Sequence, residues 1–257
     1  MIRWQAEAIW EAVSPVLPGF TVEVLPEVDS TNVELMRRVR AGQTEPVLLV
    51  AERQTAGRGR LGRPWASDVG VSLTFSLGLP LAPQDWSGLS LAVGVSLAES
   101  LHPDVRIKWP NDLWLHDRKL AGILIETAGP GGGAAPRYVV IGVGINIAPR
   151  PAQGLSTPPA WMQELLPGAD APQVLQQLVL PLVQAVKAFE AQGFTAFRSR
   201  FAARDALTGR DLVLSDGTQG AARGVGDDGA LLVHTASGMK QVTSSEISVR
   251  PAGAGKA

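Results

Sequence analysis

The segment QDWSGLSLAVGVSLAESL, residues 84–101, is apolar nearly all round and has the length of a helix. A helix without a polar face is stable only where protein surrounds it, so this segment predicts a core helix. Two strands precede it. Residues 45–53 (EPVLLVAER) and 69–77 (VGVSLTFSL) are rich in the aliphatic, β-branched and aromatic residues of buried strands. Together with an earlier helix, the elements run helix, strand, loop, strand and helix.

That earlier helix is predicted over residues 32–41 by the residues at its two ends. Thr31 stands three residues before Glu34, which is the spacing of a capping box at a helix start. Gly42 closes the segment, as glycine commonly does just past a helix end.

Residues 105–147 predict an antiparallel meander. Two short strands flank a Trp-Pro-Asn-Asp corner and a His-Asp-Arg turn, and a further strand, RYVVIGVGINI, covers 137–147. The Gly/Ala/Pro loop over 128–136 is typical of a hairpin tip without chemistry of its own. The strand over 137–147 is either an edge that pairs between subunits or a covered strand.

The last third of the chain changes its pattern. Residues 171–203 have the apolar period of a helix, which we expect to break at Pro181. After Gly209, short strands alternate with SDG, DDG and ASG turns. This predicts a small all-β barrel of about 45 residues. We therefore divide the chain into a large domain over 1–205 and a C-terminal β domain over 206–257.

Length and composition narrow the classes of function. A chain of 257 residues accommodates one large and one small domain. Lys and Arg number 23 against 24 Asp and Glu, so a protein that coats nucleic acid gets little support. The absence of cysteine excludes disulfides, thiolate zinc sites and a cysteine nucleophile. Because neither an export signal nor a membrane-spanning run is present, we expect a soluble cytoplasmic protein.

The stretch QTAGRGRLGRPW, residues 54–65, has glycines at the spacing of the dinucleotide-binding fingerprint. That fingerprint requires a helix after the glycines and an acidic residue about 20 positions further on. Here Pro64 and a strand follow, and the corresponding position after Gly57 is Leu77. The stretch is therefore not a dinucleotide site, and the Walker pattern is absent as well.

What remains is a glycine-rich loop that lets the backbone approach a ligand closely and that carries Arg58, Arg60 and Arg63. Their planar guanidinium groups suit a carboxylate or a phosphate. Two other interpretations stay open at this point: a solvated basic turn, and an arginine-glycine tract that grips RNA.

A second polar cluster lies within KWPNDLWLHDRKLAGILIE, residues 108–126. Lys108 ends one apolar strand and Lys119 opens another, while Asn111 and Asp112 occupy the corner. Charged groups at strand ends can be aimed into one cleft. The alternative for Asp112 and Lys119 is a cross-strand surface pair of small energetic value.

Asn146 interrupts the apolar strand IGVGINI. A buried asparagine needs hydrogen-bond partners, and its amide offers the donor and acceptor that suit an adenine edge. Capping within the core is the alternative. His102, His116 and His234 are scattered without metal-ligand spacing, so we assign them no metal.

With these clusters in this order, the chain resembles the biotin protein ligases, also called biotin–[acetyl-CoA-carboxylase] ligases. DSTN, AERQTAGRGRLGR, KWPNDL, RKLAGILIE and IGVGINI follow one another as in that family, and the match runs nearly the full length, to EISVR. The resemblance implies an α+β fold of the class II synthetase type: a mixed, largely antiparallel sheet flanked by helices, plus a C-terminal SH3-like β-barrel. It also implies the short type, which lacks an N-terminal DNA-binding domain.

The resemblance further implies two binding sites and a catalytic group. Biotin would be bound by Ser30, Thr31, Asn32, Gln54, Gly57, Arg58, Arg60, Lys119 and Gly122. ATP would be bound by Arg60, Arg63, Trp65, Lys108, Asn111, Lys119, Asn146 and Trp161. The catalytic residues would be Lys119, Arg60, Arg58 and Asp112.

Within this scheme Lys119 contacts the biotin carboxylate and the α-phosphate, and Asn146 contacts the adenine. Trp65 is a lid over the site, and Trp161 belongs to a second loop over the adenylate. Asp112 either holds Mg²⁺ or orients the incoming lysine, with a structural bond inside the corner as the alternative.

The implied reaction forms biotinyl-5′-adenylate from biotin and ATP with Mg²⁺, then transfers biotin to a lysine of a biotin carboxyl carrier protein. No tightly bound cofactor, nucleic acid or membrane is expected, and a homodimer is left open. A lipoate or octanoate ligase or transferase of related fold is the first alternative. A nucleic-acid-binding module that uses the arginine loop is the alternative from another class.

Overall fold

A computed structural model of the chain describes residues 2–129, 136–150, 157–243 and 249–252. Its centre is a seven-stranded sheet in the order β1-β2-β3-β7-β6-β5-β4. The strands are β1 (Thr21–Val28), β2 (Val47–Gln54), β3 (Ser72–Leu81), β4 (Arg106–Lys108), β5 (Asp112–Leu115), β6 (Arg118–Ala128) and β7 (Arg137–Asn146). Only β1 and β2 pair in parallel, and every other pair is antiparallel. The expected mixed, largely antiparallel sheet is confirmed.

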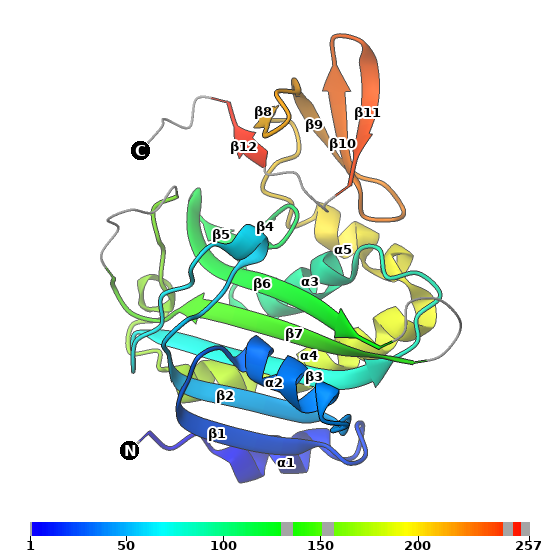
Figure 1. Cartoon of the computed structure of the whole chain (residues 1–257). Helices are drawn as coiled ribbons and strands as arrows, with labels where there is room; N and C mark the ends of the chain where they lie inside the picture. Colours follow the sequence, from blue (N-terminus) through cyan, green and yellow to red (C-terminus); the bar gives the residue numbers. More distant parts are fainter. Residues whose placement is uncertain (1, 130–135, 151–156, 244–248, 253–257) are drawn as a thin grey trace.

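Helices cover both faces of this sheet (Figure 1). The face that carries the core packs against α1 (Ala6–Val13), α3 (Leu89–Leu101) and α4 (Ala171–Gln192). The other face is crossed by α2 (Thr31–Arg40) alone among the α-helices of the described residues. The rest of that second face is covered by loops, among them the glycine and arginine segment, whose Trp65 lies over Gly122 and Gly144.

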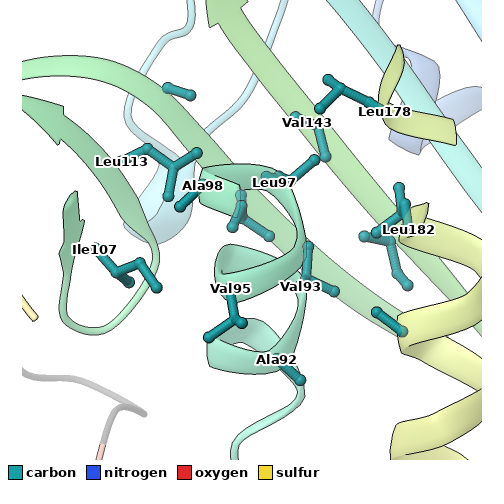
Figure 2. Packing of buried hydrophobic residues seen from close by; sticks show 14 of the residues in the cluster. Ala92, Val93, Val95, Leu97, Ala98, Ile107, Leu113, Val143, Leu178 and Leu182 are labelled. Carbon is teal, nitrogen blue, oxygen red and sulfur yellow. The ribbon is translucent and has the colours of Figure 1, made fainter. Parts of the chain in front are cut away.

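The core helix α3 is buried nearly all round, as its sequence predicts. Figure 2 shows apolar neighbours on two sides of it, with Leu178 and Leu182 of α4 on one side and Ile107 and Leu113 on the other. The meander is also confirmed: β4, β5, β6 and β7 pair in sequence order. Because β7 pairs with both β3 and β6, it is a covered strand and not an edge. Residues 130–135 of the predicted hairpin tip lie outside the described residues.

The predicted break at Pro181 is wrong, because α4 continues through it from Ala171 to Gln192. A proline inside a helix removes one backbone hydrogen bond and crowds the preceding turn. Leu178 and Leu182, one turn apart around Pro181, are both fully buried against the core. The apolar stripe continues on either side of the proline, so tertiary packing holds the helix together there.

The predicted capping box is also wrong. The residue before α2 is Ser30, whose side chain makes no cap hydrogen bond, and Thr31 is the first helical residue. The side chain of Glu34 forms ion pairs with Arg37 and Arg38 instead of returning to the helix start. The backbone N–H and the hydroxyl of Thr31 both donate to the side chain of a glutamine on β2 instead, as described below.

The C-terminal part forms a five-stranded antiparallel sheet in the order β11-β10-β9-β8-β12. Its strands are β8 (Asp211–Leu214), β9 (Gln219–Val225), β10 (Leu231–Thr235), β11 (Gly238–Val242) and β12 (Val249–Pro251). It follows two short helical elements, η3 (Phe194–Phe197) and α5 (Arg198–Ala202), and stands at one end of the large sheet (Figure 1). The division at residue 206 stays a prediction. In the part of the chain that the structure describes, no helix has the length and apolar character to span a membrane.

Candidate active site

A polar cluster lies where α2 begins, between strands β2 and β3. Gln54, the last residue of β2, accepts two hydrogen bonds at Oε1, from the backbone N–H of Thr31 at 2.7 Å and from its hydroxyl at 3.1 Å. The hydroxyl of Ser76 on β3 lies 2.7 Å from the Thr31 hydroxyl. Ser30 is buried beside them, with 3% of its surface exposed. The structure thus brings together Ser30, Thr31 and Gln54, and their binding of biotin stays a prediction.

Sequence reasoning missed Ser76. The available signal was the polar residue at every second position of an otherwise apolar strand, Ser72, Thr74 and Ser76, which points to one polar face. All three side chains are buried. A polar face that is buried and not solvated indicates a site or a hydrogen-bond network.

Asn32 extends this cluster across the sheet. Its amide nitrogen donates to the carbonyl of Leu124 at 3.2 Å and to the carboxylate of Glu126 at 2.8 Å. Its oxygen lies 2.6 Å from the Ser76 hydroxyl. A Cβ on Gly142 of β7 would stand 2.1 Å from that oxygen, so only glycine leaves room for the asparagine. Asn32 is fully engaged with protein groups at the base of the cluster.

Two paired glycines form a flat platform next to the cluster. Gly122 on β6 and Gly144 on β7 are register partners. The indole of Trp65 lies over them, because a Cβ on Gly144 would stand 2.3 Å from a ring carbon and one on Gly122 would stand 3.4 Å from another. The ring nitrogen of Trp65 is buried without a hydrogen-bond partner. The predicted lid therefore rests directly on the sheet.

The glycine and arginine loop, residues 57–65, closes on itself through its backbone. The N–H of Trp65 donates to the carbonyl of Gly57 at 2.8 Å, and the N–H of Gly59 donates to the carbonyl of Arg63 at 2.7 Å. A Cβ on Gly57 would stand 2.4 Å from the Trp65 carbonyl oxygen, which makes glycine obligatory there. The short helical turn η1 (Arg60–Gly62) forms its tip. This loop is called the flap below.

The arginines of the flap differ in environment. Arg58 and Arg63 are exposed, whereas Arg60 is half-buried. The guanidinium group of Arg60 donates to the side-chain oxygen of Asn111 at 3.2 Å. Burial lowers the pKa of Arg60, and the nearby charge of Asp112 opposes that effect. Arg60 thus joins the flap to the Trp-Pro-Asn-Asp corner.

Two lysines lie near Asp112 at that corner. The ammonium group of Lys119 forms an ion pair with Asp112 at 2.7 Å, and Lys108 is the register partner of Asp112 across β4 and β5. Lys108 is 9% exposed, and its ammonium group lies 5.8 Å from the centre of the Trp114 ring. Burial lowers its pKa to about 8, with Asp112 opposing and the neighbouring cations adding to the shift. The structure places the predicted cations, Lys108, Lys119 and Arg60, around one carboxylate.

Asn111 fixes the geometry of the corner. Its side-chain nitrogen donates to the backbone carbonyl of Ile123 at 2.8 Å, and its backbone carbonyl accepts from the N–H of Ile123 at 2.9 Å. A cavity of about 310 Å³ opens beside Arg60 and Asn111 and runs along β6 past Ile125. The corner therefore borders an open space large enough for part of a ligand.

The two remaining predicted residues lie on the far side of the flap tryptophan. The amide nitrogen of Asn146 donates to the carbonyls of Lys119 at 3.1 Å and Ala160 at 2.9 Å, while its oxygen accepts from Arg150 at 2.9 Å. These bonds cap neighbouring backbone, and an adenine contact of Asn146 stays a prediction. Trp161 stands next to Ala160, with the Arg118 guanidinium 5.8 Å from its ring centre.

Arg150 is a second residue that sequence reasoning missed. Besides Asn146, its guanidinium group donates to the carbonyl of Ala66 at 3.2 Å and lies 5.9 Å from the centre of the Trp65 ring. Lys119 lies 5.7 Å from the same ring. Two cations therefore hold the Trp65 indole on the platform.

Comparison with known proteins agrees with this arrangement. Residues 24–146 match the model of the biotin/lipoate A/B protein ligase family, and residues 213–250 match the biotin protein ligase C terminal domain. The bifunctional ligase/repressor BirA of Escherichia coli (strain K12) is 39% identical over 92% of this chain and 76% of its own length. The chain belongs to the biotin protein ligase family.

Other biotin protein ligases are similar over nearly their whole length. The biotin–[acetyl-CoA-carboxylase] ligase of Paracoccus denitrificans is 32% identical over 87% of this chain and 98% of its own. The solved biotin protein ligase of Aquifex aeolicus, in complex with biotin and ATP, has a TM-score of 0.76 and 29% identity, and covers 90% of this chain and 99% of its own. The family thus accounts for both the large sheet and the C-terminal sheet.

Proposed function

We propose that the site described above activates biotin with ATP to biotinyl-5′-adenylate and then transfers biotin to a lysine of a biotin carboxyl carrier protein. The activity is that of an ATP-dependent, AMP-forming biotin–[acetyl-CoA-carboxylase] ligase. The observation that carries the proposal is the convergence of Lys108, Lys119 and Arg60 on Asp112, next to a glycine platform and a buried polar cluster.

The polar cluster suits the ureido ring of biotin. That ring presents one carbonyl oxygen and two N–H groups, and the hydroxyls of Thr31 and Ser76 with the amide of Gln54 offer both donors and acceptors within a few ångströms of one another. Ser30 and Asn32 are buried beside these groups. Gly122 and Gly144 add no side chain to the sheet under the Trp65 indole, so a fused ring can lie there once the indole moves away.

The cations suit the anionic partners of the first step. The biotin carboxylate oxygen attacks the α-phosphorus of ATP, the bond from that phosphorus to the bridging oxygen breaks, and pyrophosphate leaves. Because both partners are negative, the barrier falls when fixed positive groups already stand where charge accumulates. Lys119 exchanges its partner Asp112 for the biotin carboxylate and the α-phosphate. Lys108 and Arg60 face the phosphates from the corner, and Arg58 and Arg63 close over them from the flap.

In the second step the amine nitrogen of the acceptor lysine attacks the biotin carbonyl carbon, AMP leaves, and one proton is released. Asp112 is the carboxylate at hand to orient the amine, once Lys119 has turned to the substrate. Mg²⁺ supplies further positive charge on the phosphates when it is bound, and Asp112 is the site carboxylate that suits it. Groups of three or more metal-ligand side chains do not occur among the described residues.

The flap keeps water from the adenylate, which is a mixed anhydride that hydrolyses readily. Trp65 leaves the platform to admit the ring of biotin and closes over it afterwards, with Gly57 as the hinge. Asn146 and Trp161 border the space on the side of Lys119 that is left for adenine. Homodimer formation, the lack of nucleic-acid binding and a cytoplasmic location stay predictions.

Intact-mass analysis of a carrier domain tests the proposal. The chain is incubated with ATP, Mg²⁺, biotin and a biotin carboxyl carrier domain, and a carrier whose acceptor lysine is replaced by arginine serves as the control. We expect one biotinyl group on the first carrier and none on the second.

A parallel reaction with lipoate distinguishes the alternative, because the matching family model covers both biotin and lipoate ligases. Modification with lipoate and not with biotin would contradict the proposal. Pyrophosphate release with biotin but without any carrier modification would confine the chain to adenylate formation.

A further inference from the structure

We propose that the C-terminal sheet acts on the ATP side of the site through one buried contact, between the indole N–H of Trp109 and the carbonyl of Gly229. Trp109 and Gly229 are then positioning residues for the segment Lys108–Asp112. The inference rests on the proposed function, since it assigns these two residues to its first step.

Trp109 stands between the functional residues of the corner. Lys108 precedes it and Asn111 and Asp112 follow within three positions. Its side chain is 1% exposed, and its ring nitrogen donates to the Gly229 carbonyl at 3.0 Å. A displacement of Gly229 therefore moves the backbone that carries the cations, because a buried donor must follow its acceptor or lose its partner.

Hydrogen bonds hold the turn that presents this carbonyl. The N–H of Gly229 donates to the carbonyl of Gly226 at 3.0 Å, and the N–H of Ala230 donates to the carboxylate of Asp228 at 3.0 Å. The other carboxylate oxygen of Asp228 accepts from the side chain of Gln241 on β11 at 2.8 Å. The turn is thus fastened to the C-terminal sheet by side-chain and backbone bonds.

The same turn presses on the start of α3. Gly229 has a φ of +76°, and a Cβ there would stand 3.0 Å from the Cα of Gly88 and 3.1 Å from a methyl group of Leu91. In the first turn of α3, the hydroxyl of Ser90 donates to the carbonyl of Pro110 at 3.2 Å. The corner is therefore held from two directions, by α3 and by the C-terminal turn that rests on α3.

The ion pairs that link the C-terminal part to the rest of the described chain are exposed. The pairs Arg210–Asp117 and Arg198–Asp227 have side chains that are each more than a third exposed. Such pairs contribute little to stability or position.

Backbone hydrogen bonds join Ile107 of β4 to Arg204 and Ala206, before the C-terminal sheet, at 2.7 and 2.9 Å. Among the described residues, the Trp109–Gly229 bond is the buried side-chain hydrogen bond between the C-terminal sheet and the segment Lys108–Asp112. Among the described residues, the biotin cluster at α2, β2 and β3 forms no hydrogen bond or ion pair with this turn, so the effect should fall on ATP and not on biotin.

Two glycines of the C-terminal sheet provide a matched pair of variants. Gly229 and Gly217 both have a positive φ, +76° and +84°, so alanine brings similar backbone strain at either place. A Cβ on Gly217 meets nothing within 4 Å, whereas one on Gly229 meets Gly88 and Leu91. Gly229→Ala must shift the turn away from α3, and Gly217→Ala leaves it in place.

Steady-state pyrophosphate release is measured with ATP and biotin varied in turn, together with the melting temperature. For Gly229→Ala we expect the KM for ATP to rise roughly tenfold, the size of effect that a small misplacement of catalytic groups produces. The KM for biotin should match that of Gly217→Ala, whereas the melting temperature should be lower for Gly229→Ala, because its Cβ meets Gly88 and Leu91. Trp109→Phe keeps the ring, removes the N–H and should shift the KM for ATP in the same direction.

The inference is overturned if Gly229→Ala and Trp109→Phe both keep the KM for ATP within twofold of the Gly217→Ala value. It is equally overturned if the KM values for ATP and biotin rise together, because that marks a general loss of structure. Parent protein that releases no pyrophosphate with biotin would contradict the proposed function itself, so the two failures are distinguishable. Should Gly229→Ala not fold, Trp109→Phe decides the question.

Discussion

The flap and the corner deliver positive charge to one site in different ways. The flap carries Arg58 and Arg63 on an exposed loop whose backbone bonds mostly join the loop to itself. The corner carries Lys108 and Lys119 on strands of the sheet, where burial fixes Lys108 and the ion pair with Asp112 fixes Lys119. Cations that must be in position before the ligand binds therefore lie on strands of the sheet. Cations that close over the ligand after it has bound lie on a loop.

The charges of the two regions also differ in how they affect the stability of the folded state. Burial opposes the charged form of Lys108, whose pKa falls to about 8. Exposed arginines on the flap carry no comparable desolvation cost, and salt screens them readily. Variants in the corner should therefore change both stability and rate, whereas variants in the flap should change rate alone.

Lys119→Ala should have the largest effect. Loss of this ammonium group removes the cation between carboxylate and phosphate and breaks the ion pair with Asp112. We expect adenylate formation to slow by roughly a hundredfold or more, about 3 kcal/mol in the transition state. Single-turnover pyrophosphate release measures the rate, and circular dichroism checks the fold.

Lys187→Ala is the control for that experiment, since Lys187 pairs with Glu190 on the exposed side of α4. It should keep the parent rate. If Lys119→Ala formed adenylate at the parent rate, the corner would have no role in the first step. The contrast drawn between the flap and the corner would then be wrong.

Lys108→Met tests the desolvation of the corner. Below pH 8 the folded parent carries a buried charge, so the variant should be the more stable protein at pH 7, by up to about 3 kcal/mol. Between pH 8 and the ordinary lysine pKa of 10.5, the folded parent releases its proton before the unfolded chain does. The stability of the parent therefore rises with pH in that window, and the difference should close.

Urea unfolding of both proteins at pH 7 and at a pH above 10 measures these differences. The same variant should raise the KM for ATP, because it removes a cation from the phosphates. A parent protein that is more stable than Lys108→Met at pH 7 would mean that Lys108 is well solvated or well paired.

Arg60→Ala should have an intermediate effect, because Arg60 joins the flap to the corner through Asn111. Loss of one charge-assisted hydrogen bond corresponds to about 2 kcal/mol, or roughly a thirtyfold loss of rate. Arg60→Lys keeps the charge without the planar fork and should recover part of that loss. Equal rates for Arg60→Ala and the parent would show that the two regions act independently.

Arg58→Ala should have the smallest effect. An exposed cation contributes about 1 kcal/mol or less, which is a few-fold in the KM for ATP. That difference should shrink at high salt, because ions screen exposed charge. Kinetics at low and high salt measure it, with Lys119→Ala as the salt-insensitive reference. A salt-independent loss as large as that of Lys119→Ala would place Arg58 inside the closed site.

Much of this architecture could be predicted from local pattern. The apolar segment 84–101 predicted a buried helix, and the meander and the C-terminal strands followed from alternation and turn residues. Pro64 and the strand that follows it excluded a dinucleotide-binding site. Motif order then pointed to the family, which the similarity to biotin protein ligases confirms.

Two predictions failed because tertiary contacts outweighed local preference. Thr31 has the spacing of a helix cap, but its N–H and hydroxyl donate to Gln54 of strand β2. Pro181 should break a helix, but the buried leucines on either side keep α4 continuous. Ser76 and Arg150 were missed because their importance depends on partners distant in sequence.

The sequence by itself determined the kinds of element, their order and the chemical groups available to the site. Those features depend on neighbouring residues, such as a period of apolar side chains or a glycine spacing. The tertiary structure alone decided which cations meet at Asp112, what lies on the glycine platform and how Trp109 joins the C-terminal sheet. These outcomes depend on burial and on contacts between distant segments, which no local pattern encodes.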